Sequence, residues 1–148
     1  MEPLARGSVA PPLPEAEAGP RAVVFYKVTC PTCQVAAPAM ERLFRSAPRS
    51  FAAVVQDPPE RAKDFNETYG TTFSPVPDTE PYDLSNAFGV RTVPTLFILD
   101  EAGRVEDVAE SWDRQGWNRA TARLAKLTGL DLPEVSEDGD GLPPFRPG

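Results

Sequence analysis

The two cysteines of the chain, Cys30 and Cys33, stand three residues apart in the segment Cys-Pro-Thr-Cys. The apolar run 22–26 precedes them and is typical of a buried strand, so the cysteines lie where a strand ends and a helix begins. A thiol at a helix start faces unpaired backbone N–H groups and the positive end of the helix dipole, which favour its thiolate. A second thiol one helical turn further along is near enough to form a disulfide with the first. These residues predict a two-electron thiol–disulfide couple.

Two other interpretations of the cysteine pair stay open. In the first, the pair forms half of a zinc or iron–sulfur site that a second chain completes, because two thiols fall short of the four ligands such a site needs. Alternatively, both cysteines are inert buried thiols. The chain has no histidine, which excludes imidazole bases, Cys–His nucleophile pairs and His-ligated metals. We expect no metal and no organic cofactor.

Length and charge narrow the class of protein further. A chain of 148 residues suits one domain with a substantial core. Its 15 basic and 22 acidic residues give a formal net charge of −7, which argues against nucleic acid and anionic membranes as partners. Residues 1–6 lack the apolar stretch of a secretion signal, and no segment approaches the length of a membrane helix. We expect a cytoplasmic protein; a periplasmic or exported chain whose leader has been removed would read the same way.

The distribution of proline, glycine and acidic residues divides the chain into three parts. Residues 1–20 contain five prolines and predict an extended arm, of which 9–13 could lie along a sheet edge. Residues 131–148 are rich in acidic residues, glycine and proline, and predict a solvated, flexible tail. The folded domain should therefore span residues 21–130.

Within that domain, hydrophobic periodicity and turn residues predict an α/β order of elements. A helix follows the cysteines and contains Pro38, which should kink it, and Gly70 ends a second helix that Pro58-Pro59 opens. The proline-rich segment 71–82 is expected to be irregular, and a short helix over 83–89 is expected to be capped by Asp83. The last helix begins near Asp113 and ends at Gly129. Buried strands are predicted over 22–26, 51–55 and 95–99, and turn residues at 100–103 predict an antiparallel hairpin between 95–99 and 104–110.

Residues 21–130 resemble the thioredoxin superfamily in three features. They are the paired cysteines after an apolar strand, Pro38 five residues beyond Cys33, and Val93-Pro94-Thr95 at the start of a strand. The segment 89–105 resembles the cytochrome-maturation and peroxiredoxin-like branch, as does the extra sequence between the second strand and Val93. The resemblance implies a thioredoxin fold, in which helices flank a central mixed β-sheet, with an insertion between the second strand and the cis-proline loop.

The resemblance also implies roles for particular residues. Cys30 would be the exposed nucleophile and Cys33 the partly buried resolving thiol of a thiol:disulfide oxidoreductase, most simply a disulfide reductase. Pro94 would be the cis proline that faces them, and Val93 would offer its backbone to an extended substrate. Pro31 and Thr32, between the cysteines, would border the same substrate groove and tune the redox potential. The implied partners are protein or small-molecule disulfides and an upstream thiol reductant, and we expect a monomer.

The chain departs from the family pattern at the residues that usually accept the proton of the resolving thiol. Val24 stands where many thioredoxins have a buried aspartate, and Ala36 stands where membrane-anchored relatives have a glutamate. Asp57, Asp78 or water would have to serve instead, which predicts slow resolution and a long-lived mixed disulfide. Thr29 replaces the usual tryptophan before the first cysteine.

Two rival functions remain. One is peroxide reduction in the peroxiredoxin manner, although the residues around Cys30 do not reproduce that pattern. The other is a non-catalytic redox-sensing or interaction domain, whose disulfide alters partner binding without turnover. The periodicity places most aromatic residues in the core rather than at a cofactor and leaves Trp112 ambiguous; the predicted core members are Phe25, Tyr26, Phe44, Phe97 and Trp117.

Overall fold

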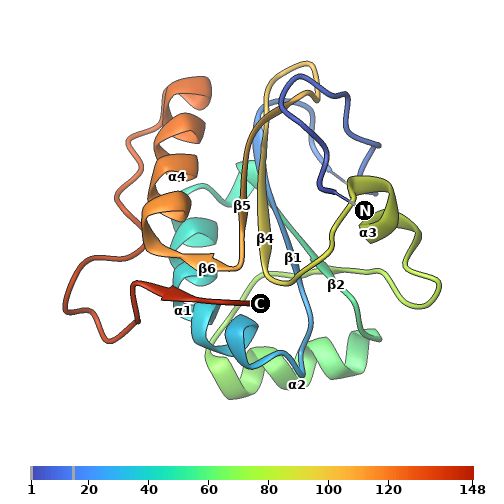
Figure 1. Cartoon of the computed structure of the whole chain (residues 1–148), viewed down its shortest axis with the longest axis vertical. Helices are drawn as coiled ribbons and strands as arrows, with labels where there is room; N and C mark the ends of the chain where they lie inside the picture. The colour runs from blue at the N-terminus through green and yellow to red at the C-terminus, as the bar shows by residue number, and fades with distance from the viewer. Residues whose placement is uncertain (1, 15) are drawn as a thin grey trace.

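A mixed five-stranded sheet forms the centre of the molecule (Figure 1), and the computed structural model describes residues 2–14 and 16–148. The strand order is β3-β2-β1-β4-β5. β1 runs parallel to β2 and antiparallel to β4, and β4 and β5 form the predicted antiparallel hairpin. The strands span Arg21–Tyr26 (β1), Phe51–Val55 (β2), Val76–Pro77 (β3), Thr95–Leu99 (β4) and Val105–Glu110 (β5).

The helices follow the sequence signals closely. Pro38 lies inside the first helix, and Pro59 opens the second. Gly70 and Gly129 adopt left-handed backbone angles, with φ of 75° and 74°, which end α2 and α4 as glycine does best. Among the described helices, none is both long and apolar enough to cross a bilayer. The helices span Pro31–Ser46 (α1), Pro59–Tyr69 (α2), Asp83–Phe88 (α3) and Arg114–Thr128 (α4), with a 3₁₀ turn, η1, at Pro48–Ser50.

The sheet is covered on both faces, because its central strands β1 and β4 are buried on both sides (Figure 1). Val24 and Tyr26 of β1 point into a core shared with α1 and α4. Val23 and Phe25, one residue out of phase, point into a second core, where the Phe25 and Phe88 rings lie 4.9 Å apart. This three-layer arrangement fixes the end of β1 and therefore the position of the cysteines that follow it.

Two local predictions between β2 and β4 are wrong. Asp83 does not cap α3: the Asp78 carboxylate accepts the N–H groups of Leu84 and Ser85 at 3.1 and 2.7 Å. The segment 71–82, predicted to be irregular, contains β3, which pairs with Val54 and Val55. The apolar stretch of β3 is only two residues long, too short for a periodicity to reveal.

The arm and the tail both pack against the sheet domain. In the arm, Val9 forms an antiparallel bridge with Arg104, consistent with the expected sheet-edge position, and Leu13 is buried. The tail differs from the solvated segment that its composition predicts, because Val135 and Ser136 are each only 2% exposed. A second, two-stranded sheet joins β6 (Trp112–Asp113) to β7 (Phe145–Arg146) in the tail.

Candidate functional site

Cys30 is the N-cap residue of α1, as the sequence predicts. Its backbone is extended, with φ −80° and ψ 117°, and its sulfur accepts a hydrogen bond from the Cys33 N–H at 3.2 Å. Its own N–H donates to the Lys27 carbonyl oxygen at 3.2 Å, which ties the cysteine to the end of β1. The sulfur therefore takes the place of the oxygen that usually caps a helix, where backbone donors stabilise negative charge.

The pKa of Cys30 is lowered to about 6. The side-chain hydrogen bond from Cys33 contributes most, burial opposes it, and the backbone N–H groups of Cys33 and Thr32 support it. The positive charge of Arg146 lowers the pKa further. Lys27 contacts Cys30 through its backbone carbonyl. At neutral pH Cys30 is mostly thiolate, the nucleophilic form.

Cys33 lies in the core, with no exposed surface. Burial, followed by the Cys30 thiol and the charge of Asp57, raises the pKa of Cys33 far above its usual value. The two thiols are not bridged in this structure. The pair thus joins a partly exposed, acidic thiol to a buried, protonated one.

The loop before β4 faces the pair. The Val93–Pro94 peptide bond is cis, as the family resemblance implies, and the Cys30 thiol donates to the Val93 carbonyl oxygen at 3.4 Å. The Pro94 carbonyl accepts the Ser111 N–H at 2.8 Å, which holds the loop against the chain that follows β5. The structure therefore brings Val93 and Pro94, which the family resemblance implies, together with Cys30 and Cys33.

The two residues between the cysteines differ in their surroundings. Pro31 is exposed at the first position of α1, whereas Thr32 is only 3% exposed. The Thr32 hydroxyl donates to the Pro147 carbonyl oxygen and accepts from Arg146 Nε at 3.1 Å. The Thr32 hydroxyl is therefore hydrogen-bonded to the tail both as a donor and as an acceptor. Sequence reasoning missed this contact, because the tail has neither hydrophobic periodicity nor a motif to place it.

Of the two carboxylates considered as bases for Cys33, the structure places Asp57 beside the pair. Asp57 is 8% exposed, accepts the Val28 N–H at 2.9 Å, and raises the pKa of Cys33 through its charge. Asp78 instead holds the start of α3. Burial raises the pKa of Tyr26, and the neighbouring Cys33 and Asp57 groups add to the effect. The buried Tyr26 hydroxyl has no hydrogen-bond partner within the described structure.

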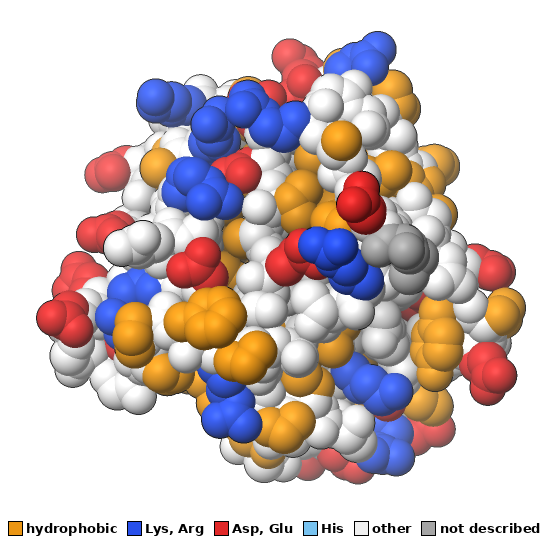
Figure 2. All heavy atoms as spheres, in the orientation of Figure 1, with side chains coloured by type: hydrophobic (Ala, Val, Ile, Leu, Met, Phe, Trp, Pro, Cys, Tyr) orange, Lys and Arg blue, Asp and Glu red, His pale blue; other side chains and the backbone are white. Residues whose placement is uncertain are grey.

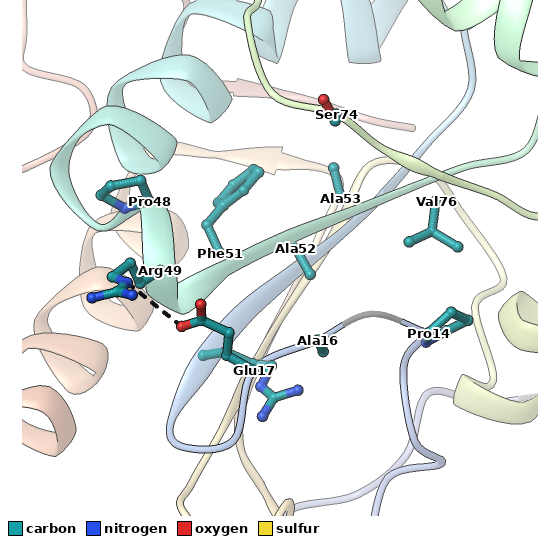
Figure 3. Close-up of a pocket in the computed structure, with 11 residues that line it drawn as sticks. Pro14, Ala16, Glu17, Pro48, Arg49, Phe51, Ala52, Ala53, Ser74 and Val76 are labelled. Carbon is teal, nitrogen blue, oxygen red and sulfur yellow. Dashed lines mark ion pairs between the residues drawn. The ribbon is translucent and has the colours of Figure 1, made fainter.

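Other features of the described residues lie away from the cysteines. No group of three His, Cys, Asp or Glu side chains in residues 2–14 and 16–148 is arranged to hold a metal ion. A hollow of about 290 Å³ lies between the arm and the start of β2, where Glu17 and Arg49 form an ion pair at 3.7 Å (Figure 3). Cys30 follows the opposite end of β1, so this hollow lies at the other end of the parallel strands.

The sheet, the capped thiol and the cis proline define a dithiol protein of the thioredoxin fold. Residues 12–108 match the model of the AhpC/TSA family, and the chain belongs to that family. The match begins inside the proline-rich arm and includes Cys30, Cys33 and the Val93–Pro94 loop.

Individual relatives agree with this assignment. The chain is 31% identical over 88 residues to the thiol-disulfide oxidoreductase ResA of Geobacillus thermodenitrificans strain NG80-2, covering 57% of this chain and 50% of the relative. The chain thus spans about half the length of the curated relatives it matches.

Two solved structures share the fold. MTB dsbF, solved in mixed oxidized and reduced forms, is 26% identical with a TM-score of 0.60 and covers 72% of this chain and 81% of its own. A secreted Mycobacterium tuberculosis disulfide oxidoreductase homologous to E. coli DsbE is 16% identical, with a TM-score of 0.58 and coverages of 74% and 82%.

Proposed function

We propose that this chain is a thiol:disulfide oxidoreductase in which Cys30 is the nucleophile and Cys33 the resolving thiol. The observation that carries the proposal is the capped sulfur of Cys30, which accepts the Cys33 N–H at 3.2 Å and has a pKa of about 6. A thiol that only fills the core needs neither an anion-stabilising donor nor surface access, and Cys30 has both.

The first step is attack of the Cys30 thiolate on one sulfur of a substrate disulfide. A bond forms between Cys30 Sγ and that sulfur, the substrate S–S bond breaks, and the second substrate sulfur leaves as a thiolate that takes a proton from solvent. Val93, whose carbonyl accepts from Cys30, and Pro94 would border the substrate in this step. Pro31, exposed beside Cys30, would line the same surface.

The second step releases the substrate. Cys33 loses its proton and attacks Cys30 Sγ, the mixed disulfide breaks, and the substrate leaves with its second thiol. The substrate gains two electrons, and the Cys30–Cys33 pair becomes a disulfide that an upstream thiol reductant restores. Asp57 is the proposed proton acceptor, since it is the buried carboxylate whose charge reaches Cys33. Because burial holds Cys33 in its protonated form, this step should be slow.

An insulin-reduction assay with dithiothreitol as electron donor tests the proposal. We expect turnover by the wild-type chain, loss of turnover in Cys30→Ser, and a trapped mixed disulfide in Cys33→Ser. No turnover by the wild type would instead favour the redox-sensing domain, and consumption of hydrogen peroxide that requires Cys30 would favour the peroxide reductase.

Direction and partners depend on the redox potential. The redox potentials of such couples span about 150 mV between thioredoxin and the oxidant DsbA. The fold alone therefore does not fix whether the cysteine pair reduces or oxidises its substrate. We propose a reductase acting as a monomer on protein or small-molecule disulfides. A Cys30–Cys33 potential well above the cytosolic glutathione poise would instead assign it as an oxidant.

The comparisons do not favour the cytoplasmic location expected from the sequence. One protein of the same fold is described as secreted, so we propose the exported alternative. Fractionation of the cells that make the protein, followed by immunodetection, tests this: a signal confined to the cytoplasm would contradict it.

A further inference from the structure

The segment 143–148, which we call the covering segment, runs across the face of the molecule that carries Cys30. β7 lies within it and pairs antiparallel with β6, opposing Arg146 to Trp112. The Trp112 indole donates to the Pro143 carbonyl oxygen at 2.7 Å, and the Arg114 N–H donates to the Pro144 carbonyl oxygen at 3.0 Å. These bonds fix the path of the covering segment along β6.

Upstream, a charged cluster holds the tail in place. The Asp140 carboxylate accepts from Arg42 Nη1 at 2.8 Å, from the Ser136 hydroxyl at 2.8 Å and from the Leu142 N–H at 3.0 Å. The pKa of Asp140 is lowered, chiefly by the Leu142 N–H, so the carboxylate is charged at neutral pH. Arg42 belongs to α1, so the cluster ties the tail to the helix that the cysteines begin.

The far end of the covering segment reaches the proposed substrate surface itself. Pro147 accepts from the Thr32 hydroxyl, and Arg146 Nε donates to the same hydroxyl oxygen at 3.1 Å. The Gly148 N–H donates to Ser111 Oγ at 3.1 Å. A Cβ atom added to Gly148 would overlap the Val93 carbonyl oxygen and the Thr92 hydroxyl, so no side chain fits there without movement.

This placement conflicts with binding of a protein substrate. The Val93 carbonyl oxygen that Gly148 abuts is the group to which Cys30 donates, and Val93 is the residue expected to pair with an extended substrate. Adjacent extended chains need about 4.8 Å between their axes, so a substrate strand and the covering segment cannot both lie against Val93. A small disulfide needs only the Cys30 sulfur, which remains partly exposed.

The covering segment is nevertheless held weakly enough to leave. β7 has only two residues, residues 144–148 are exposed, and the Phe145 side chain retains 57% of its accessible surface. Figure 2 shows hydrophobic side chains at the surface around the position of β7. Short strands with little buried apolar surface open locally far more readily than a core.

We propose that the covering segment determines which disulfides reach Cys30: in place, it admits small disulfides, and it must leave before a polypeptide can react. The inference rests on the proposed function. The rate with a protein disulfide then scales with the fraction of molecules whose covering segment is displaced.

Gly148→Val tests this directly, since its side chain would collide with Val93 and displace the end of the segment without altering either cysteine. The matched control is Ala18→Val. Ala18 is a small exposed residue that precedes β1, at the end of that strand opposite Cys30. We expect Gly148→Val to raise the rate of insulin reduction by about tenfold, the gain available when a minor open state becomes dominant. The rate with hydroxyethyl disulfide should change little, because the charge of Arg146 is the smallest of the causes that lower the Cys30 pKa. Asp140→Ala, which removes the upstream anchor, should act in the same direction.

The possible results distinguish a failure of the inference from a failure of the proposed function. If the wild type reduces neither substrate, the proposed function is wrong. If it reduces both and Gly148→Val changes neither rate, or changes both by one factor, only the inference is wrong. As a second measurement, a mixed disulfide between a peptide and Cys30 in Cys33→Ser should speed amide hydrogen exchange at Phe145, Arg146 and Gly148, the residues of the covering segment that have a backbone N–H. A mixed disulfide with mercaptoethanol should leave that exchange slow; equal exchange in the two adducts would overturn the inference.

Discussion

The Cys30 thiol and the Val93 carbonyl oxygen lie 3.4 Å apart, and the thiol is the donor. The same sulfur accepts the Cys33 N–H at 3.2 Å. When Cys30 ionises it loses the bond to Val93 and keeps the bond from Cys33, so the carbonyl of Val93 becomes free for another donor. Ionisation of the nucleophile is therefore coupled to the availability of the group that would bind substrate backbone.

Alkylation of Cys30 by iodoacetamide should rise with pH and level off above a midpoint near 6, since its pKa is lowered to about 6 and the thiolate is the reactive form. Below the midpoint the rate should fall about tenfold per pH unit, as the thiolate fraction does. Mass spectrometry of quenched samples locates the label on Cys30. A midpoint near 8.5, the value of an unperturbed thiol, would contradict the capping role of α1.

Much of this site could be predicted from the sequence, because its parts are encoded locally. The apolar run before Cys30 and the proline after it specify the strand end and the helix start, whereas the opposing loop at Val93-Pro94 is indicated by the family resemblance. Arg146 could not be predicted as a neighbour of Thr32. It lies in a segment without periodicity, and bonds to backbone groups such as the Pro143 carbonyl place that segment. Because hydrogen bonds to backbone carbonyls do not depend on residue type, the sequence does not reveal them.

Asp57→Asn should slow resolution of the mixed disulfide. Removing the negative charge lowers the pKa of Cys33, which favours its thiolate, but burial keeps that thiol protonated at neutral pH in either chain. Loss of the acceptor therefore dominates, and we expect a decrease on the order of tenfold to hundredfold, typical of a lost general base. Quenched-flow trapping of the insulin adduct measures the rate.

Asp78→Asn is the matched control for that measurement. Asp78 is equally buried, at 8% exposed, but accepts from Leu84 and Ser85 at the start of α3. We expect it to lower the free energy of unfolding while leaving the resolution rate unchanged. Equal slowing by the two variants would mean that Asp57 acts through stability and not as the acceptor.

Tyr26→Phe should stabilise the chain. The Tyr26 hydroxyl is buried without a hydrogen-bond partner, so the folded state bears its desolvation cost, which the phenylalanine ring avoids. We expect a gain of about 1 kcal/mol in the free energy of unfolding, measured by urea denaturation. Tyr69→Phe, at a residue 37% exposed, is the control and should change stability little. A loss of stability in Tyr26→Phe would show that the hydroxyl is satisfied in solution.

Glu41→Gln should destabilise the chain at neutral pH by about 1–2 kcal/mol, the range for hydrogen bonds to a charged group. The Glu41 carboxylate accepts the Thr72 N–H at 2.8 Å, the Thr72 hydroxyl at 2.6 Å and Arg45 Nε at 2.7 Å, which fastens α1 to the segment after α2. Burial alone would raise the pKa of Glu41, but the bonds from Thr72 and Arg45 outweigh it and lower the pKa below 4.5.

The direction of that shift fixes the pH dependence of the Glu41→Gln effect. A carboxyl group with a lowered folded-state pKa stabilises the fold fully above its unfolded value of 4.5 and loses this contribution as pH falls through the folded value. The difference between wild type and Glu41→Gln should therefore be constant from pH 6 to 7 and shrink below pH 4.5. Glu67→Gln, at an exposed carboxylate of α2, should show no such trend. A difference that stays constant down to pH 3 would mean that the Glu41 carboxylate acts by its shape and not by its charge.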